Sequence, residues 1–327
     1  MKKYIARFVM IFSLILGATF LFSSTTEAAD YNVTKIDAKG VNNTYGSSDI
    51  RINKDGQLQY YTFFDSGKKD VFKKVIYNEK TTTSKKLFKR KMFGDYEVVK
   101  QNGDKTLWLV YQKNKNHYFV KYNDKGKVLT KIKTGKIKAN YHFSICDIVE
   151  DGNKIYCVLK GYLPKKQKKY IDILCINKNK SKIISRKRIS IKNSYLLEFA
   201  NNKIYAMDGN NIDVYSLKGK NLATYQLPEG STYKDKEYYV DAYTVKGGVI
   251  YYVNTRGLFK CDELETKAFE IIYDASNDDL FTKSEGTCKT VSELCVKNDN
   301  EFYLVFSNDA EFDTTAPTAI ARYTKKK

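Results

Sequence analysis

A short turn followed by an apolar strand with a central aromatic residue recurs six times along this 327-residue chain. The turns are pairs such as Asp55-Gly56 and Gly247-Gly248, whose residues accept the positive φ of tight hairpins. The aromatic positions are Tyr60, Trp108, Tyr156, Tyr205, Tyr251 and Tyr303. Their spacings of 48, 48, 49, 46 and 52 residues leave room for four strands per unit and exclude the shorter solenoid repeats.

The order of segments inside each unit predicts the architecture. In the fourth unit, residues 195–200, 203–207, 212–216 and 222–227 read as four successive strands separated by short turns. The last unit has only three, ending with 318–323, and a single strand at 31–36 is left over at the other end. We therefore predict an all-β, six-bladed β-propeller of four-stranded blades, in which the N-terminal strand completes the last blade and removes the exposed sheet edges.

Two strands in the second half of the chain carry a resemblance to a known superfamily. Residues 250–254 (IYYVN), followed by Gly257 and Leu258, resemble the strand and return of YWTD-type propellers, and residues 204–208 (IYAMD) form a looser second copy. Over residues 31–327 the chain thus resembles six-bladed propellers of the TolB-like and YWTD-like kind. The resemblance implies an architecture and no reaction, because such propellers include both receptor modules and enzymes.

The N-terminus has the order of a secretory signal peptide. Lys2, Lys3 and Arg7 precede an apolar run at residues 8–22, and small residues then favour cleavage near Ala28 or Ala29. This run is shorter than the ~20 residues that a membrane-spanning helix needs, and an uncleaved anchor is the alternative. We predict a signal peptide at 1–29, a single propeller domain at 30–327 without a transmembrane segment, and a secreted monomer.

The net charge of +20 comes from 57 Lys and Arg against 37 Asp and Glu. Removing residues 1–29 takes away three bases and Glu27, which leaves 54 against 36, or +18. A positive potential of this size attracts polyanions in a salt-dependent way, and outside the cell these include anionic wall polymers and acidic polysaccharides. The alternative interpretation is a compositional bias in which the charges only solvate the surface.

Three basic segments are predicted to share one face of the ring. In a propeller, the connections from the second to the third strand and from one blade to the next lie on the same side. This places residues 85–91 (KKLFKRK), 133–138 (KTGKIK) and 160–169 (KGYLPKKQKK) together, with aromatic residues that suit negatively charged sugars. A solvated charged rim is the alternative. The candidate ligand-binding residues are Lys89, Arg90, Lys136, Lys138, Tyr162, Lys165, Lys166, Lys168 and Lys169.

Sequence motifs of common enzymes are absent. The chain has no Gly-x-Ser-x-Gly, no phosphate-binding Gly-rich loop and no His-Glu-x-x-His. His117 and His142 are its two histidines, and their separation of 25 residues does not fit a usual zinc site. We expect His117 to be an exposed strand residue and His142 to begin an innermost strand.

Ionisable residues recur on the predicted innermost strands, where side chains reach a central channel. The channel candidates are Glu97, His142, Glu198, Asp241 and Glu293. If the carboxylates converge, Ca²⁺ is the cation that they would hold; otherwise no cofactor is expected and the charges line a wet channel. Residues 274–279 (DASNDD) and 308–313 (NDAEFD) are further oxygen-rich candidates, although neither has EF-hand spacing.

Six cysteines remain after removal of the signal peptide. A two-residue turn at 151–152 would place Cys146 opposite Cys157, with Cys175 beside Cys157 on the next strand. One disulfide with a thiol left over and three buried thiols both fit this row, and we favour thiols.

Together these features favour a secreted, non-catalytic binding or scaffold module whose ligand is an anionic extracellular polymer or a protein partner. The alternative is a cation-dependent hydrolase or lyase with its site at the central channel, using the inner carboxylates and His142. A self-associating component of a surface layer is a third hypothesis. Neutralising the basic face discriminates a surface binder from an axial enzyme, which would instead fail after Asp241→Asn.

Overall fold

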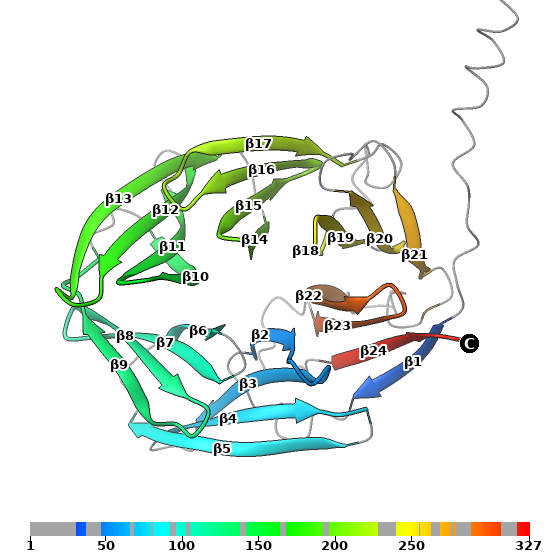
Figure 1. Ribbon diagram of the computed structural model, residues 1–327, viewed down its shortest axis with the longest axis horizontal. Coiled ribbons are helices and arrows are strands. Elements are labelled where there is room, and N and C mark those ends of the chain that lie inside the picture. The colour runs from blue at the N-terminus through cyan, green and yellow to red at the C-terminus, as the bar shows by residue number, and fades with distance from the viewer. Residues whose placement is uncertain are drawn as a thin grey trace, which may run out of the picture.

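The computed structural model is a ring of six four-stranded antiparallel sheets, with one strand of each sheet nearest the centre and the other three successively farther out (Figure 1). It describes residues 31–36, 47–65, 69–79, 81–91, 96–102, 105–137, 142–163, 168–191, 196–227, 240–254, 256–262, 269–275, 278, 289–308 and 319–327. Nowhere in these ranges is there a helix of the length and apolarity that crossing a membrane requires. The protein is an all-β, six-bladed β-propeller, as the repeat predicts.

Five blades consist of four consecutive strands each, numbered from the centre outward. Blade 1 contains β2 (Ser47–Ile52), β3 (Leu58–Asp65), β4 (Lys69–Tyr77) and β5 (Thr82–Lys91). Blade 2 contains β6 (Tyr96–Asn102), β7 (Thr106–Lys113), β8 (Asn116–Asn123) and β9 (Val128–Lys133). Blade 3 contains β10 (His142–Asp151), β11 (Lys154–Leu163), β12 (Lys168–Asn177) and β13 (Lys182–Ile191). Blade 4 contains β14 (Leu196–Ala200), β15 (Lys203–Asp208), β16 (Asn211–Ser216) and β17 (Asn221–Gln226). Blade 5 contains β18 (Ala242–Lys246), β19 (Val249–Asn254), β20 (Gly257–Asp262) and β21 (Glu270–Asp274).

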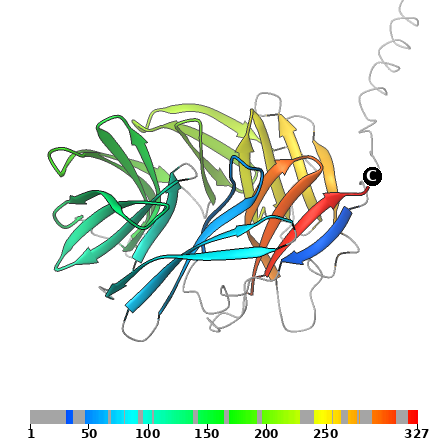
Figure 2. The same ribbon diagram turned by 60° about the horizontal axis from the view of Figure 1, so that its bottom comes forward.

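The sixth blade joins the two ends of the described chain, as predicted. It contains β22 (Lys289–Asn298), β23 (Glu301–Asn308), β24 (Ala319–Lys325) and, as its outer strand, β1 (Tyr31–Ile36). β1 runs antiparallel to β24, from Tyr31 opposite Lys325 to Ile36 opposite Ile320, and Figure 2 shows the two strands side by side. The centre of the Tyr31 ring lies 5.5 Å from the ring centre of Tyr273 in blade 5, so β1 also contacts the neighbouring blade. Within blade 6, the Tyr31 ring centre lies 5.4 Å from that of Phe302.

The hairpin turns have the backbone that their residues favour. Asn201 and Asn202 have φ of 51° and 59°, and Gly247 and Gly248 have φ of 60° and 82°, as type I′ turns require at both central positions. Gly257, in the segment that resembles the YWTD return, has φ of 138°, and a β-carbon there would clash with the Tyr273 carbonyl. Glycine is therefore required at this position.

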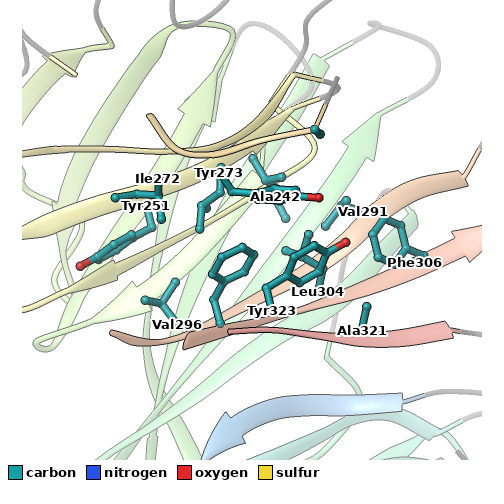
Figure 3. Packing of buried hydrophobic residues seen from close by; sticks show 14 residues of the cluster. Ala242, Tyr251, Ile272, Tyr273, Val291, Val296, Leu304, Phe306, Ala321 and Tyr323 are labelled. Carbon is teal, nitrogen blue, oxygen red and sulfur yellow. The ribbon is translucent and has the colours of Figure 1, made fainter. Parts of the chain in front are cut away.

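In the part of the chain that the structure describes, the hydrophobic core consists of six clusters, and each lies between two adjacent blades. The cluster between blades 5 and 6 combines Tyr251 and Ile272 with Leu304 and Tyr323 (Figure 3). The other five clusters follow the same rule at the remaining blade junctions, including the junction of blade 6 with blade 1. All six repeated aromatic residues are buried and belong to these clusters, namely Tyr60, Trp108, Tyr156, Tyr205, Tyr251 and Tyr303.

The prediction that Cys146, Cys157 and Cys175 lie side by side in blade 3 is wrong, because the strands pair in a different register. A β-bulge between Ile145 and Asp147 displaces Cys146, so that Cys157 lies opposite Ile148. On its other side, Cys157 lies opposite Leu174 rather than Cys175. Cys157 and Cys175 are buried and are not joined by a disulfide, which confirms thiols at these two positions.

His117 is buried, which corrects its expected exposure. It lies two residues from Phe119 on the face of β8 that packs against blade 3. Its Nδ1 accepts a hydrogen bond of 3.3 Å from the Ile137 backbone N–H, and its carbonyl accepts one of 2.9 Å from the Thr134 N–H. His117 therefore helps to hold the segment that leads from blade 2 into blade 3.

Replacing Tyr31 with alanine should destabilise the ring, because the substitution removes two aromatic contacts and a hydroxyl that donates to the Asp299 carbonyl. We expect a loss of about 2 kcal/mol in the free energy of unfolding. Urea unfolding can be followed by the fluorescence of Trp108, the single and fully buried tryptophan. Val33→Ala is the matched control, since Val33 is exposed on the same strand. Equal effects of the two substitutions would contradict a closing role for Tyr31.

Candidate functional site

The antiparallel strand order gives the ring two distinct faces. We call upper face the side that carries the hairpins from second to third strands and the links between blades. The lower face carries the hairpins from first to second and from third to fourth strands. The predicted basic segments belong to the upper face.

Several members of the predicted basic set lie at the upper ends of blades 1 to 3. Lys89 is exposed near the end of β5, Lys136 is exposed between β9 and β10, and Lys168 is exposed at the start of β12. Tyr162 is 39% exposed near the end of β11 and lies opposite the half-buried Lys169. These positions combine cationic side chains with an accessible aromatic ring.

The remaining members of this set fall outside what the structure describes. Arg90 belongs to β5, but its side chain is not among those described, and Lys138, Lys165 and Lys166 lie outside the described residues. The segment 85–91 also differs from its expected form, because it is part of the outer strand β5 rather than a connection. Lys85, Lys86 and Lys89 of this segment are exposed on the outer strand of blade 1.

Lys113 and Lys115 add to the upper face and were missing from the sequence-based set. Both are exposed at the hairpin between β7 and β8, where Asn114 and Lys115 have φ of 49° and 63°. The sequence signal that could have identified them is the Lys-Asn-Lys-Asn turn at residues 113–116, between two strands of alternating polarity. This turn connects the second strand of its blade to the third, as residues 163–168 do in blade 3.

The positive charge is concentrated in blades 1 to 3. Residues 47–91 contain 12 Lys and Arg against 5 Asp and Glu, which gives +7, and residues 96–133 contain 9 against 3, which gives +6. Residues 142–191 contain 12 Lys and Arg against 4 Asp and Glu, which gives +8. Residues 242–274 of blade 5 contain 4 Lys and Arg against 5 Asp and Glu, which gives −1. A difference of nine charges between two blades of one ring gives the molecule a strong lateral asymmetry of potential.

Two of the predicted channel carboxylates connect neighbouring blades. Glu198 of β14 accepts a 2.9 Å hydrogen bond from the Thr244 hydroxyl of β18. Glu293 of β22 accepts a 3.3 Å hydrogen bond from the Ile50 backbone N–H of β2. Each glutamate is thus held by the inner strand of the next blade around the ring, which gives it a structural role.

The other channel candidates are not brought together with them by a described contact. Asp241 immediately precedes β18, and its backbone N–H donates to the Val253 carbonyl at 2.9 Å. Glu97 and His142 lie in β6 and β10, with side chains outside those described. Within the described part of the chain, no group of three or more His, Cys, Asp or Glu residues is placed to hold a metal ion.

An ion pair recurs towards the lower face, directly beside the repeated aromatic residue. In blade 2, Lys121 lies opposite Trp108, with its Nζ 5.8 Å from the ring centre. The same Nζ contacts Glu150 of blade 3 at 2.6 Å, and Lys178 contacts the other oxygen of Glu150 at 2.8 Å. Blades 2 and 3 are therefore joined by charge as well as by apolar packing.

Blade 5 repeats this arrangement with different residues. Lys260 lies opposite Tyr251 and contacts Asp299 of blade 6 at 2.6 Å. The Tyr251 hydroxyl donates to the same carboxylate at 2.9 Å. In both junctions a cation on the third strand reaches a carboxylate near the first hairpin of the next blade.

Blade 6 completes the pattern with an arginine. Arg322 lies opposite Tyr303 and contacts Glu301 of its own blade at 2.9 Å. It also contacts Glu79 of blade 1 at 2.9 Å, across the junction at which the ring closes. Sequence reasoning missed these ion pairs, because each joins residues of different strands or blades.

The lysine contacts lower the pKa of Glu150. Desolvation by burial is the largest single effect and raises it, but the hydrogen bonds and charges of Lys121 and Lys178 together outweigh burial. The pKa of Asp299 is lowered in the same way, against burial, by Lys260 and Tyr251. Both carboxylates are therefore more acidic in the folded protein than in the unfolded chain.

In the acidic segment 274–279, the described residue Asp278 has a structural function. The Asp278 carboxylate accepts hydrogen bonds of 2.8 Å from the hydroxyls of Tyr273 and Tyr323. Burial, followed by the interaction with Asp278, raises the pKa of Tyr273 far above its usual range. Asp278 thus joins blade 5 to blade 6, whereas residues 309–313 of the second acidic segment lie outside the described residues.

Comparison with known proteins finds solved structures to which this chain is similar. Neither a family model nor a curated protein matches the sequence. The β-propeller domain of the Trilobed protease from Pyrococcus furiosus is 13% identical, covers 85% of this chain and 78% of its own length, and has a TM-score of 0.45. An α-L-arabinofuranosidase from Fusarium graminearum is 10% identical over 87% of this chain and 95% of its own, with a TM-score of 0.49. The Pan2 WD40 domain from Neurospora crassa is 10% identical over 92% and 97%, with a TM-score of 0.45. The closer resemblance to TolB-like and YWTD-like propellers stays a prediction.

Glu150→Gln should reduce stability at pH 7 by about 1–2 kcal/mol, because it removes a charge that two lysines hold. The folded pKa of Glu150 lies below the unfolded value, so its contribution is present above the unfolded pKa and is lost as the pH falls through the folded pKa. The variant should therefore show a flatter decline in unfolding free energy between about pH 5 and pH 3. Urea titrations at a series of pH values measure this.

The neighbouring exposed residue supplies the control for this prediction. Asp151→Asn removes a negative charge from the adjacent position without affecting the contacts of Lys121 and Lys178. It should leave stability within about 0.5 kcal/mol of the parent. If Glu150→Gln kept the slope of the parent protein with pH, the proposed coupling between blades 2 and 3 would be wrong.

Proposed function

We propose that this propeller is an exported, monomeric and non-catalytic binding module that recognises an anionic extracellular polymer. The binding surface is the upper face of blades 1 to 3, continued onto the outer wall of blade 3. The proposal rests above all on one observation, the excess of positive charge on blades 1 to 3, which reaches +8 in blade 3 against −1 in blade 5.

The exposed residues of the upper face support this proposal. Lys89, Lys115, Lys136 and Lys168 come from three consecutive blades, so a long polymer can contact several of them at once. Many weak contacts with a repeating anion add up to a useful affinity through multivalency, without a deep pocket. The exposed Tyr162 supplies an apolar face on which a sugar ring can rest.

The hydrogen bonding of the inner strands favours binding over catalysis. A catalytic carboxylate must reach a substrate, whereas Glu198 and Glu293 engage Thr244 and Ile50 of adjacent blades. These contacts give the two inner glutamates a function in the ring itself.

Replacing Lys89, Lys115, Lys136 and Lys168 together with glutamine should lower the affinity for polygalacturonate at least tenfold at low salt. Each exposed cation contributes a screened attraction, so the loss should become smaller as the salt concentration rises. Isothermal titration calorimetry of the full chain at two salt concentrations measures both effects.

A matched variant on the opposite face separates binding from total charge. Lys125, Lys127, Lys180 and Lys218 are exposed at hairpins of the lower face, and replacing them with glutamine removes the same four charges. This variant should keep most of the affinity. Equal losses for the two variants would contradict a specific upper face. A rise in melting temperature with Ca²⁺ that Asp241→Asn abolishes would instead favour an axial catalytic site.

A further inference from the structure

A buried carboxylate holds two arginines on the outer edge of blade 3. Asp172 of β12 is fully buried, and Arg188 of β13 lies directly opposite it in the strand register. Arg186 lies two residues from Arg188, so both guanidinium groups belong to the same face of the sheet. A buried charge is costly unless it is paired, and here one carboxylate is paired with two cations.

The contacts fix both arginines in place. Arg188 donates from Nε to Asp172 Oδ1 at 2.9 Å and from Nη2 to Oδ2 at 3.0 Å, which is the two-point geometry of an arginine–carboxylate pair. Arg186 donates to Oδ2 from its Nε at 3.0 Å and also from its Nη2. The Arg188 guanidinium in addition stacks over the Tyr170 ring, 4.7 Å from its centre.

The pair is held firmly yet remains accessible. The side chains of Arg186 and Arg188 are 29% and 43% exposed, whereas that of Asp172 is 1% exposed. One negative and two positive charges leave a net charge of +1 at this edge, and Lys182 and Lys187 of the same strand are also exposed. A lysine ammonium sits on a flexible four-carbon stem, whereas a guanidinium held by a buried carboxylate is preorganised and loses less entropy on binding.

We propose that Arg186 and Arg188 form an oxyanion clamp, positioned by Asp172, that binds the repeating carboxylate or phosphate groups of an anionic polymer. This inference rests on the proposed function and adds a specific contact to it. Guanidinium groups match the paired oxygens of carboxylates and phosphates in a way that ammonium groups do not. The lysines supply attraction at long range, and the clamp supplies recognition of the charged group.

A charge-conserving substitution tests the clamp. The double variant Arg186→Lys, Arg188→Lys keeps the net charge but loses the planar forks, so its affinity for polygalacturonate should fall about tenfold. Its dependence on salt should stay that of the parent, because the number of charges is unchanged. Lys187→Gln is the control, since Lys187 lies between the two arginines on the opposite face of β13 and its loss should cost threefold or less.

Chemical footprinting of arginines in the parent protein tests the clamp even if the double variant folds poorly. Phenylglyoxal modifies accessible arginines, and mass spectrometry can compare its rate at each site. Polygalacturonate should slow the modification of Arg186 and Arg188 at least threefold and should leave the exposed Arg256 of blade 5 unchanged. Equal protection of Arg256, or no protection of the pair, would overturn the proposal.

Three polymers identify the group that the clamp recognises. Polygalacturonate offers carboxylates, poly(glycerol phosphate) offers phosphates, and dextran offers neither. Binding of either anionic polymer that depends on the two arginines supports the clamp, and the tighter one names its ligand group. Equal binding of dextran overturns the clamp. If the parent protein binds no anionic polymer, the proposed function fails; if it binds one and the double variant binds it equally, only the clamp fails.

Discussion

Apolar packing between neighbouring blades is the interaction on which the whole structure depends. Each of the six core clusters combines side chains from two adjacent sheets. A four-stranded sheet that is apolar on both faces needs a neighbour on each side, so the series of blades is satisfied only when the last blade meets the first. The contacts of Tyr31 and Ile36 follow from this requirement, because β1 brings them to the junctions of blade 6 with blades 5 and 1.

Because the core occupies the faces between blades, charge can vary freely at the strand ends and on the outer strands. Towards the lower face, Glu150 and Asp299 are paired with cations of adjacent blades. In blade 3 the excess of cations is largest, and only Asp172 offsets the arginines of the outer strand. One scaffold thus carries two uses of charge, with ion pairs that join the blades towards the lower face and exposed cations on the upper face and outer wall of blades 1 to 3.

The fold was predictable because each blade contains its own local signals. Paired turn residues such as Asn201-Asn202 and the aromatic residue that follows give a strand pattern that repeats without long-range information. The bulge at Cys146 was not predictable from the spacing of the hairpin, and its extra residue reverses the inside–outside alternation beyond it. His117 shares its strand face with Phe119, but its burial involves contacts with Thr134 and Ile137 of another segment, which the local pattern does not show. The basic segments were visible as composition, but the pairing of Asp172 with Arg186 and Arg188 depends on register, which composition does not show.

Amide hydrogen exchange of the full chain, with and without polygalacturonate at low salt, tests the central claim most directly. That claim is that the charge asymmetry of the ring defines its binding surface. The account predicts slower exchange on ligand addition in β11, β12 and β13 and in the hairpin between β7 and β8, with β18 to β21 unchanged. Protection confined to the inner strands β14, β18 and β22 would contradict it and would place the ligand in the central channel instead.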